Sequence, residues 1–319
     1  MDLKIIPYEE QYLNDMVKLF TIHYKNLINQ IPFLPHKYLD YKNNEEMIKW
    51  LFSNYDGVIA LREGQLVGYL SGIIVPNFKS SKTGIYTPEW GHGVNDQQFL
   101  VVYDEMLKEL NKKWKEVHYG VHAISFLSHF NHSINHFFWN GYGMFVIDGL
   151  SSVNPLPSIN TIEIREANVY DWDPLVDLLE EYYIEMSGYP TYSMLNLNKL
   201  EDELESDLAN DNVKLWIAIE NKKIIGLMKT EINSKESCTM VRDRKTLGIG
   251  MTYVKEIDRH KGIGQTLLNH VHHYASEAHY ERLTVNFEAN DYMTRKFWLN
   301  NFDPVCFSLI RYLDDRLIK

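Results

Sequence analysis

Cysteine is scarce in this sequence. Only Cys238 and Cys306 occur in 319 residues, too few for the disulfide framework of a small secreted protein. No stretch approaches the roughly 18 consecutive apolar residues that a membrane-spanning helix needs. The N-terminal MDLKIIPYEEQ also lacks the basic segment and apolar run of a signal peptide. We therefore expect free thiols, no membrane partner and a cytoplasmic protein.

Basic residues are outnumbered by acidic ones. The chain has 32 Lys and Arg against 43 Asp and Glu, a net charge of -11. Proteins that bind nucleic acid by bulk attraction need a clustered basic surface, so we expect no nucleic-acid partner. The acidic charge instead fits a soluble protein and a cationic substrate.

The length indicates two domains, because single domains commonly have about 100–200 residues. The segment SSVNPLPSINT, residues 151–161, has two prolines, three serines and no charge, which is typical of a linker. After it the chain starts again with a predicted strand and a predicted helix over 173–186. We predict a first domain over 1–150, the linker, and a second domain over 162–319.

Two patterns of the first half recur in the second. Each half has a strand, a polar turn and a second strand, VIALREGQLVGYL (58–70) and LWIAIENKKIIGLM (215–228). In each an alanine stands eight residues before a glycine, at Ala60 and Gly68 and at Ala218 and Gly226. Further on, FFWNGY (137–142) and FWLNNF (297–302) match at an offset of 160. These matches in the same order predict the duplication of one α/β unit.

The most informative segment is RHKGIG, residues 259–264. An apolar strand ending near Tyr253 and Val254 precedes it, and an amphipathic helix follows directly. Backbone N–H groups at such a turn point outward beside the positive end of the helix dipole, which makes an anion site. Gly262 and Gly264 leave room for a phosphate to approach the backbone. An ordinary glycine-bearing turn that opens a helix is the alternative interpretation, because short glycine motifs occur by chance.

This loop resembles motif A of the GNAT N-acyltransferases, R-x-x-G-x-G after the fourth strand, which holds the pyrophosphate of acetyl-CoA. The segments that follow, RLTVNFEAN, DYMTRKFWLNN and FDPVCFSLI, resemble the family's motif B and its order of strand, helix and strand. Asn290 matches the Asn that caps the motif B helix in the family. The resemblance covers 161–319 nearly end to end. It implies an α/β (α+β) fold of two tandem GNAT domains, each a mixed, mostly antiparallel sheet flanked by helices.

In this family the fourth and fifth strands splay apart at a bulge, and the pantetheine arm lies in the gap like an added strand. The resemblance therefore implies acetyl-CoA as co-substrate. The positions that it assigns to cofactor binding are Thr252, Tyr253, Val254, Arg259, His260, Lys261, Gly262, Ile263, Gly264, Gln265, Asn290 and Phe297.

The first half lacks this loop. The position 160 residues before Arg259 is Phe99, in FLVVYD, which contains no glycine. We therefore interpret residues 1–150 as a degenerate GNAT-like domain, either structural or forming one wall of the substrate site.

The chemistry that the family implies is direct attack of an amine on the thioester, with a base for the amine and an acid for the leaving thiolate. The usual motif B tyrosine is absent, since Phe297 or Trp298 stands at its position. The catalytic candidates are the carboxylates nearest the fourth strand, Glu231 and Glu256, and the nearby Tyr292. The acceptor is expected to be a primary amine of a small molecule or a peptide.

Two other function classes stay open: a non-catalytic module that binds or senses acyl-CoA, and a transferase of longer acyl chains or to a different acceptor. The histidines at 129, 132 and 136 share a helical spacing but match no zinc signature, so we expect no metal site. The acidic run EDELESDLAND, residues 201–211, is expected to be a solvated helix face or to border the entry of a cationic amine.

Overall fold

The computed structural model describes residues 3–79, 82–157, 162–193, 195–232 and 234–314. The chain divides into two compact units. Unit 1 contains Met1–Ile147, Cys238–Met240 and Pro304–Lys319, and unit 2 contains Asp148–Ser237 and Val241–Asp303. The predicted division at residues 150 and 161 stays a prediction. No helix in the described ranges is long and apolar enough to cross a membrane.

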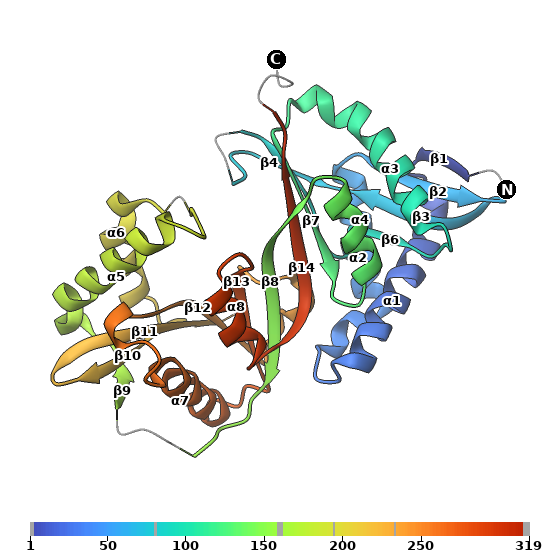
Figure 1. The fold of residues 1–319 in the computed structure, drawn as a ribbon. Coiled ribbons are helices and arrows are strands. Elements are labelled where there is room, and N and C mark those ends of the chain that lie inside the picture. Colours follow the sequence, from blue (N-terminus) through green and yellow to red (C-terminus); the bar gives the residue numbers. More distant parts are fainter. Residues whose placement is uncertain (1–2, 80–81, 158–161, 194, 233, 315–319) are drawn as a thin grey trace. The chain divides into compact units, whose positions relative to one another are not determined.

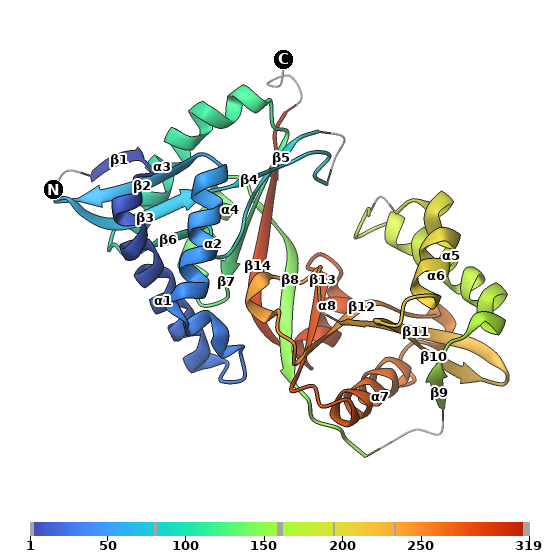
Figure 2. The same ribbon diagram turned by 180° about the vertical axis from the view of Figure 1, so that it is seen from behind.

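Among its described residues, unit 1 combines a four-stranded sheet with further strands and four α-helices. The sheet has the order β1-β2-β3-β6, with β1 at Leu3–Pro7, β2 at Gly57–Arg62, β3 at Gln65–Ser71 and β6 at His92–Val94. Strand β4 (Ile73–Val75) pairs with β5 (Gly84–Thr87), β5 pairs with β7 (Val121–Leu127), and β7 pairs with β14 (Asp303–Tyr312). The helices are α1 (Leu13–Gln30), α2 (Tyr41–Asn54), α3 (Phe99–Trp114) and α4 (Asn131–Trp139). Within the unit α3 and α4 face the viewer in Figure 1, and α1 and α2 do so in Figure 2.

Unit 2 contains the strand order β13-β12-β11-β10-β9. These strands are β9 (Glu163–Glu166), β10 (Val213–Glu220), β11 (Lys223–Ile232), β12 (Thr246–Val254) and β13 (Arg282–Glu288). Helices α5 (Trp172–Ser187) and α6 (Leu200–Leu208) lie on one face, and α7 (Ile263–Glu277) lies on the other. A last helix, α8 (Tyr292–Leu299), follows β13. The apolar periodicity predicted for 173–186 appears as α5, which buries Leu175, Leu178, Leu179 and Tyr183.

Strands β8 (Gly143–Ser152) and β14 do not follow the division of the sequence into two halves. Strand β14 comes from the C-terminal end of the sequence but belongs mostly to unit 1, where Cys306 pairs with Leu127. Strand β8 begins in unit 1, and its end from Asp148 onward belongs to unit 2. There the Thr284 hydroxyl of β13 donates to the Gly149 carbonyl at 2.8 Å. Each unit is therefore built from both halves of the sequence.

The predicted hairpins occur with the same local structure. Ala60 pairs with Gly68 and Ala218 with Gly226, and each strand pairing shifts register at the following residue. Both glycines lie against the next strand. A Cβ at Gly68 would meet the Gly93 carbonyl oxygen at 3.2 Å, and one at Gly226 would meet the Tyr253 carbonyl oxygen at 3.1 Å. Close approach of the third strand thus explains why glycine stands at both positions.

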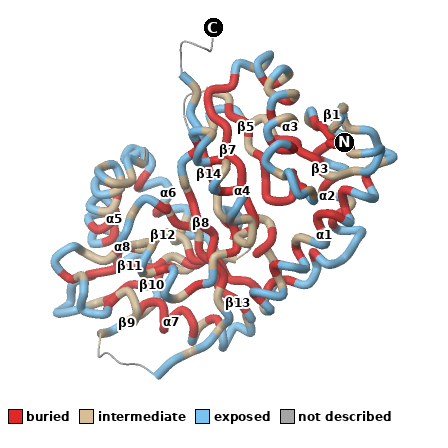
Figure 3. Tube along the Cα trace, turned by 45° about the vertical axis from the view of Figure 1, so that its right-hand side comes forward, coloured by how far each residue is buried: buried red, intermediate tan, exposed pale blue. Residues whose placement is uncertain are grey.

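The late helix ends also match. The Asn140 N–H donates to the His136 carbonyl, and the Asn300 N–H donates to the Lys296 carbonyl, again at an offset of 160. In Figure 3 the buried residues run along the strands and the inner helix faces, while the outer helix faces are exposed. The side chain of Phe137 is fully buried, whereas Phe297 at the matching position is only partly buried.

Candidate functional site

The N-terminus of α7 is open to a ligand. Gly262 precedes the helix with φ of 82°, in the left-handed region that favours glycine. No side chain caps α7, and its first turn holds no acidic residue. By contrast, the Asp291 carboxylate caps α8 by accepting from the N–H groups of Met293 and Thr294. The first N–H groups of α7 therefore point outward beside the positive end of the helix dipole, which favours an anion.

Strands β12 and β13 separate beside this helix, as the resemblance implies. Strand β12 pairs with β13 only from Thr246 to Ile249, opposite Arg282 to Val285. It continues to Val254, and its pairing with β11 shifts register between Met228 and Thr230. The last residues of β12 therefore offer backbone groups on the side away from β11.

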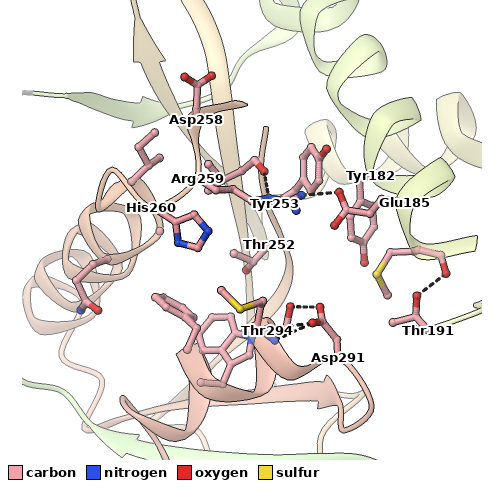
Figure 4. Close-up of a pocket in the computed structure, with 18 of the residues that line it drawn as sticks. Tyr182, Glu185, Thr191, Thr252, Tyr253, Asp258, Arg259, His260, Asp291 and Thr294 are labelled. Atoms are coloured by element: carbon pink, nitrogen blue, oxygen red, sulfur yellow. Dashed lines mark hydrogen bonds and ion pairs between the residues drawn. The ribbon is translucent and has the colours of Figure 1, made fainter. Parts of the chain in front are cut away.

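A cavity of about 480 Å³ lies at this place. Most of the predicted cofactor positions line it: Thr252, Tyr253, Val254, Arg259, His260, Gly262, Ile263, Gly264, Gln265 and Phe297. Lys261 and Asn290 do not line it. The other lining residues, which the sequence reasoning did not assign to cofactor binding, are Tyr182, Glu185, Met186, Tyr189, Pro190, Thr191, Asp258, Asp291, Met293, Thr294 and Trp298. Figure 4 shows how residues of α5, β12, the loop and α8 converge on it.

The cations of the loop are held by neighbouring carboxylates. The Arg259 guanidinium donates to the Glu185 carboxylate at 2.5 Å and to the Val254 carbonyl at 3.0 Å, as Figure 4 shows. The Lys261 ammonium lies 2.6 Å from the Asp258 carboxylate. Both cations of the loop are therefore paired with carboxylates in this structure.

Two tyrosines contribute protonated hydroxyls. The rings of Tyr182 and Tyr253 lie 5.7 Å apart between centroids. Burial, with the nearby Glu185 carboxylate, raises the pKa of Tyr253 to about 12. Burial, with the Glu288 carboxylate, also raises the pKa of Tyr182. Both phenols are therefore neutral at physiological pH and can donate hydrogen bonds.

The predicted catalytic residues lie outside the cavity lining. Tyr292 has 59% of its surface exposed, and Glu256 is exposed in the short turn before the loop. Glu231 is partly buried at the end of β11, and burial, with Glu236 nearby, raises its pKa. None of the three lines the cavity, and their catalytic roles stay predictions.

The helix cap expected from the resemblance moves by one residue. Asp291 caps α8, because its carboxylate reaches the N–H groups two and three residues ahead. The Asn290 amide instead donates to the Pro190 carbonyl at 2.6 Å. Asn290 thereby ties the start of α8 to the segment that follows α5.

The histidines at 129 and 136 have different surroundings, and His129 lies 5.8 Å from His23 between ring centroids. His136 contacts the Asp104 carboxylate at 2.8 Å, and His129 stacks on Phe130. In the acidic segment, α6 exposes most of its carboxylates, while Asp207 pairs with Lys229 at 2.7 Å. The predictions that these histidines hold no metal and that the acidic segment is solvated or borders an amine entry stay predictions.

Helix α3 of unit 1, which precedes α4 as α7 precedes α8, has a different N-terminus. The residue before it is Gln98, whose N–H donates to the Asp96 carboxylate at 2.7 Å. Asp96 also accepts from Arg62 at 2.7 Å, which keeps the pKa of Asp96 below its usual value. No side chain caps α3 either, but the paired Asp96 carboxylate lies just before it, and no glycine directly precedes the helix.

Residues 172–301 match the family model described as the acetyltransferase (GNAT) family. A GCN5-related N-acetyltransferase from Sphaerobacter thermophilus is 11% identical with a TM-score of 0.60, covering 97% of this chain and 95% of that chain. A GNAT-family acetyltransferase from Colwellia psychrerythraea is 11% identical with a TM-score of 0.50, covering 98% and 100%.

A third structure is the glucosamine N-acetyltransferase region of a fungal multi-domain GH3 beta-N-acetylglucosaminidase. It is 13% identical with a TM-score of 0.53, covering 97% of this chain and 38% of that one. The search of curated proteins found no match. These structural matches span almost the whole chain and confirm the predicted fold class.

Proposed function

Residues 172–301 form an acetyltransferase domain of the GNAT family, and on this premise we propose that the chain transfers an acetyl group from acetyl-CoA to a primary amine. The chain is an acyltransferase. The proposal adds the donor, the acceptor class and a direct attack without a covalent enzyme intermediate. The observation that carries it is the uncapped N-terminus of α7 at the cavity, beside a strand that has separated from its neighbour.

The cofactor's pyrophosphate would lie at the first N–H groups of α7. Gly262 and Gly264 leave the approach open, since a Cβ at Gly264 would meet only the Phe297 ring, at 3.6 Å. The pantetheine arm would lie along the unpaired end of β12, from Thr252 to Val254. The residues present therefore fit this cofactor in both charge and shape.

The reaction needs few groups from the protein. The amine nitrogen forms a bond to the acetyl carbon, the carbon–sulfur bond breaks, and the thiolate takes a proton. A backbone N–H near Val254 would polarise the carbonyl. Tyr182 and Tyr253 are two of the hydroxyl-bearing residues that line the cavity, and they are better placed than Tyr292 to protonate the thiolate. Glu231 stays the candidate base because its raised pKa favours proton uptake.

We further propose that the first half is a degenerate copy that holds no cofactor. The matching hairpins and helix ends support a duplication. Gln98 precedes α3 where Gly262 precedes α7, so the first half lacks the glycine turn that would admit a phosphate. One acetyl-CoA per chain is therefore expected.

A non-catalytic acyl-CoA-binding module is the second candidate. It is favoured by one observation: Phe297, which carries no proton to transfer, lines the cavity where relatives are expected to have a tyrosine.

Isothermal titration of the full chain with acetyl-CoA, followed by a thiol-release assay, tests these proposals. The amine panel should include polyamines, peptides and glucosamine, the acceptor named for the fungal neighbour. One site per chain with amine-dependent thiol release supports the transferase. Binding without release for any amine supports the module. Two sites per chain would overturn the degenerate first copy, and tighter competition by longer acyl-CoAs would overturn the choice of acetyl.

A further inference from the structure

Unit 1 contains a buried group of three metal-ligating side chains that no part of the proposed reaction uses. Glu89, Cys238 and Cys306 each offer a ligand atom, and these atoms all lie within 4.8 Å of one another. The three residues are 1%, 5% and 0% exposed. They come from distant parts of the sequence: the loop between β5 and β6, the segment Cys238–Met240, and β14.

The surrounding hydrogen bonds hold two of these segments in place. The Met240 N–H donates to the Glu89 carboxylate at 3.1 Å. The neighbouring Thr239 accepts from the Tyr38 hydroxyl through its carbonyl, at 2.5 Å, and from the Trp90 indole through its hydroxyl, at 3.2 Å. Oriented ligands of this kind are typical of metal sites, where partners outside the ligand set fix the ligands' positions.

We propose that Glu89, Cys238 and Cys306 bind a divalent zinc-type cation. Zinc bonds are about 2.3 Å to thiolate sulfur and about 2.0–2.2 Å to carboxylate oxygen. In a tetrahedron these lengths place the ligand atoms about 3.6–3.8 Å apart, so the observed cluster needs only a small contraction. Binding releases the two thiol protons, and a water molecule completes the four ligands. Two thiolates favour zinc over magnesium or calcium, which prefer oxygen ligands.

A bound metal would hold two later segments of the sequence, those with Cys238 and Cys306, in unit 1. Cys238 and Cys306 lie 149 and 217 residues after Glu89 in the sequence. A metal that holds all three stabilises the folded chain because the unfolded chain cannot present the same ligand set. The histidine spacing predicted no metal site, and two cysteines this far apart in the sequence do not indicate one. This inference is independent of the transferase proposal, since residues of unit 2 line the cavity.

Cobalt(II) is the sharpest probe of the site. The chain has only two cysteines, so thiolate-to-cobalt charge-transfer absorption can arise only from Cys238 and Cys306. The reduced full-length protein is stripped with a chelator and titrated with Co²⁺, and Zn²⁺ is then added in competition. We expect one equivalent of Co²⁺, charge-transfer bands that Zn²⁺ abolishes, and a higher unfolding temperature with either metal.

Three variants assign the ligands. Cys238→Ser and Cys306→Ser should each halve the charge-transfer intensity. Glu89→Gln keeps an acceptor for the Met240 N–H and should retain the bands while weakening Co²⁺ affinity by at least about 10-fold. The exposed His279→Gln is the matched control and should change nothing.

Absence of charge-transfer bands in the folded wild-type protein would overturn the proposal, even if the cysteine variants fail to fold. Unchanged bands in either serine variant would do the same. A third overturning outcome is a Cys238–Cys306 disulfide on air oxidation together with no metal uptake by the reduced protein, which would mean that the thiols serve a redox role.

Discussion

Substitutions at Gly264 separate cofactor binding from protein stability. Gly264 is the second residue of α7, and a Cβ there would make only an ordinary contact with the Phe297 ring, at 3.6 Å. Replacing glycine in a helix with alanine typically stabilises it by about 0.5–1 kcal/mol. A carboxylate in the first turn adds about 0.3–1 kcal/mol through the helix dipole. We therefore expect Gly264→Ala, Gly264→Gln and Gly264→Glu to fold at least as stably as the wild type.

The affinity for acetyl-CoA should instead fall, and it should fall furthest in Gly264→Glu. A carboxylate about 6 Å from each phosphate, at an effective dielectric constant of about 20–40, costs roughly 1.4–2.8 kcal/mol per phosphate. For two phosphates the loss is roughly 3–6 kcal/mol, or at least about 100-fold in Kd. Gly264→Gln has the same size without the charge, so the difference between these two variants measures the electrostatic part alone. Gly264→Ala measures how much affinity is lost when a small side chain hinders the approach of the phosphate to the backbone.

Isothermal titration at low and high salt, with a thermal melt of each variant, completes the test. The gap between Gly264→Glu and Gly264→Gln should narrow at high salt, because ions screen exposed charges. Equal affinity of the two variants would refute the placement of a phosphate at the N-terminus of α7. A loss of affinity that accompanies a fall in melting temperature would show that folding was damaged instead.

Three further outcomes are expected. The raised pKa of Tyr253 means that the folded state favours the neutral phenol, so stability is full below pH 10 and is lost as the pH rises toward 12. Tyr253→Phe should flatten that alkaline loss in urea titrations between pH 9 and 12, and an unchanged slope would contradict it. Burial lowers the pKa of His129 to about 4, so its contribution is full above pH 6.5 and is lost as the pH falls toward 4. His129→Gln should therefore reduce acid destabilisation in melts between pH 4 and 7, and an equally steep loss would count against it. A chain that starts at 148 should melt higher than one that starts at 162, because residues 148–156 bond to β13 and α7, and equal melting temperatures would contradict that.

Local sequence patterns were sufficient to predict the elements that form the proposed cofactor site. The loop, its glycines and the following helix are contiguous, and their geometry depends on backbone freedom and helix polarity. The hairpins were predictable for a similar reason, since the alternation of apolar residues and the Ala–Gly spacing are local. The separation of β12 from β13 was predicted from the resemblance to the GNAT family.

Residues brought to the cavity from elsewhere were not predictable in this way. Glu185 and Tyr182 lie on α5, some 75 residues before the loop, and as part of an amphipathic helix they look like any surface carboxylate or core aromatic. Their importance arises from the side of the sheet on which α5 packs. The units to which β8 and β14 belong could not be predicted either, because a strand's own sequence does not specify which neighbour it pairs with.

The same distinction explains why the donor side of the reaction is clearer than the acceptor side. A pyrophosphate is recognised by backbone N–H groups and a helix dipole, which a short sequence can encode. An amine is generally recognised by side chains from several elements, and α5, the segment around Pro190 and α8 all contribute to the lining of this cavity. Glu185 is relevant to both sides, because it lines the cavity and pairs with Arg259 of the loop. If the proposed phosphate paired with Arg259, the Glu185 carboxylate would be released within the cavity, where a cationic amine could pair with it. Binding of the donor would thus prepare the site for the acceptor.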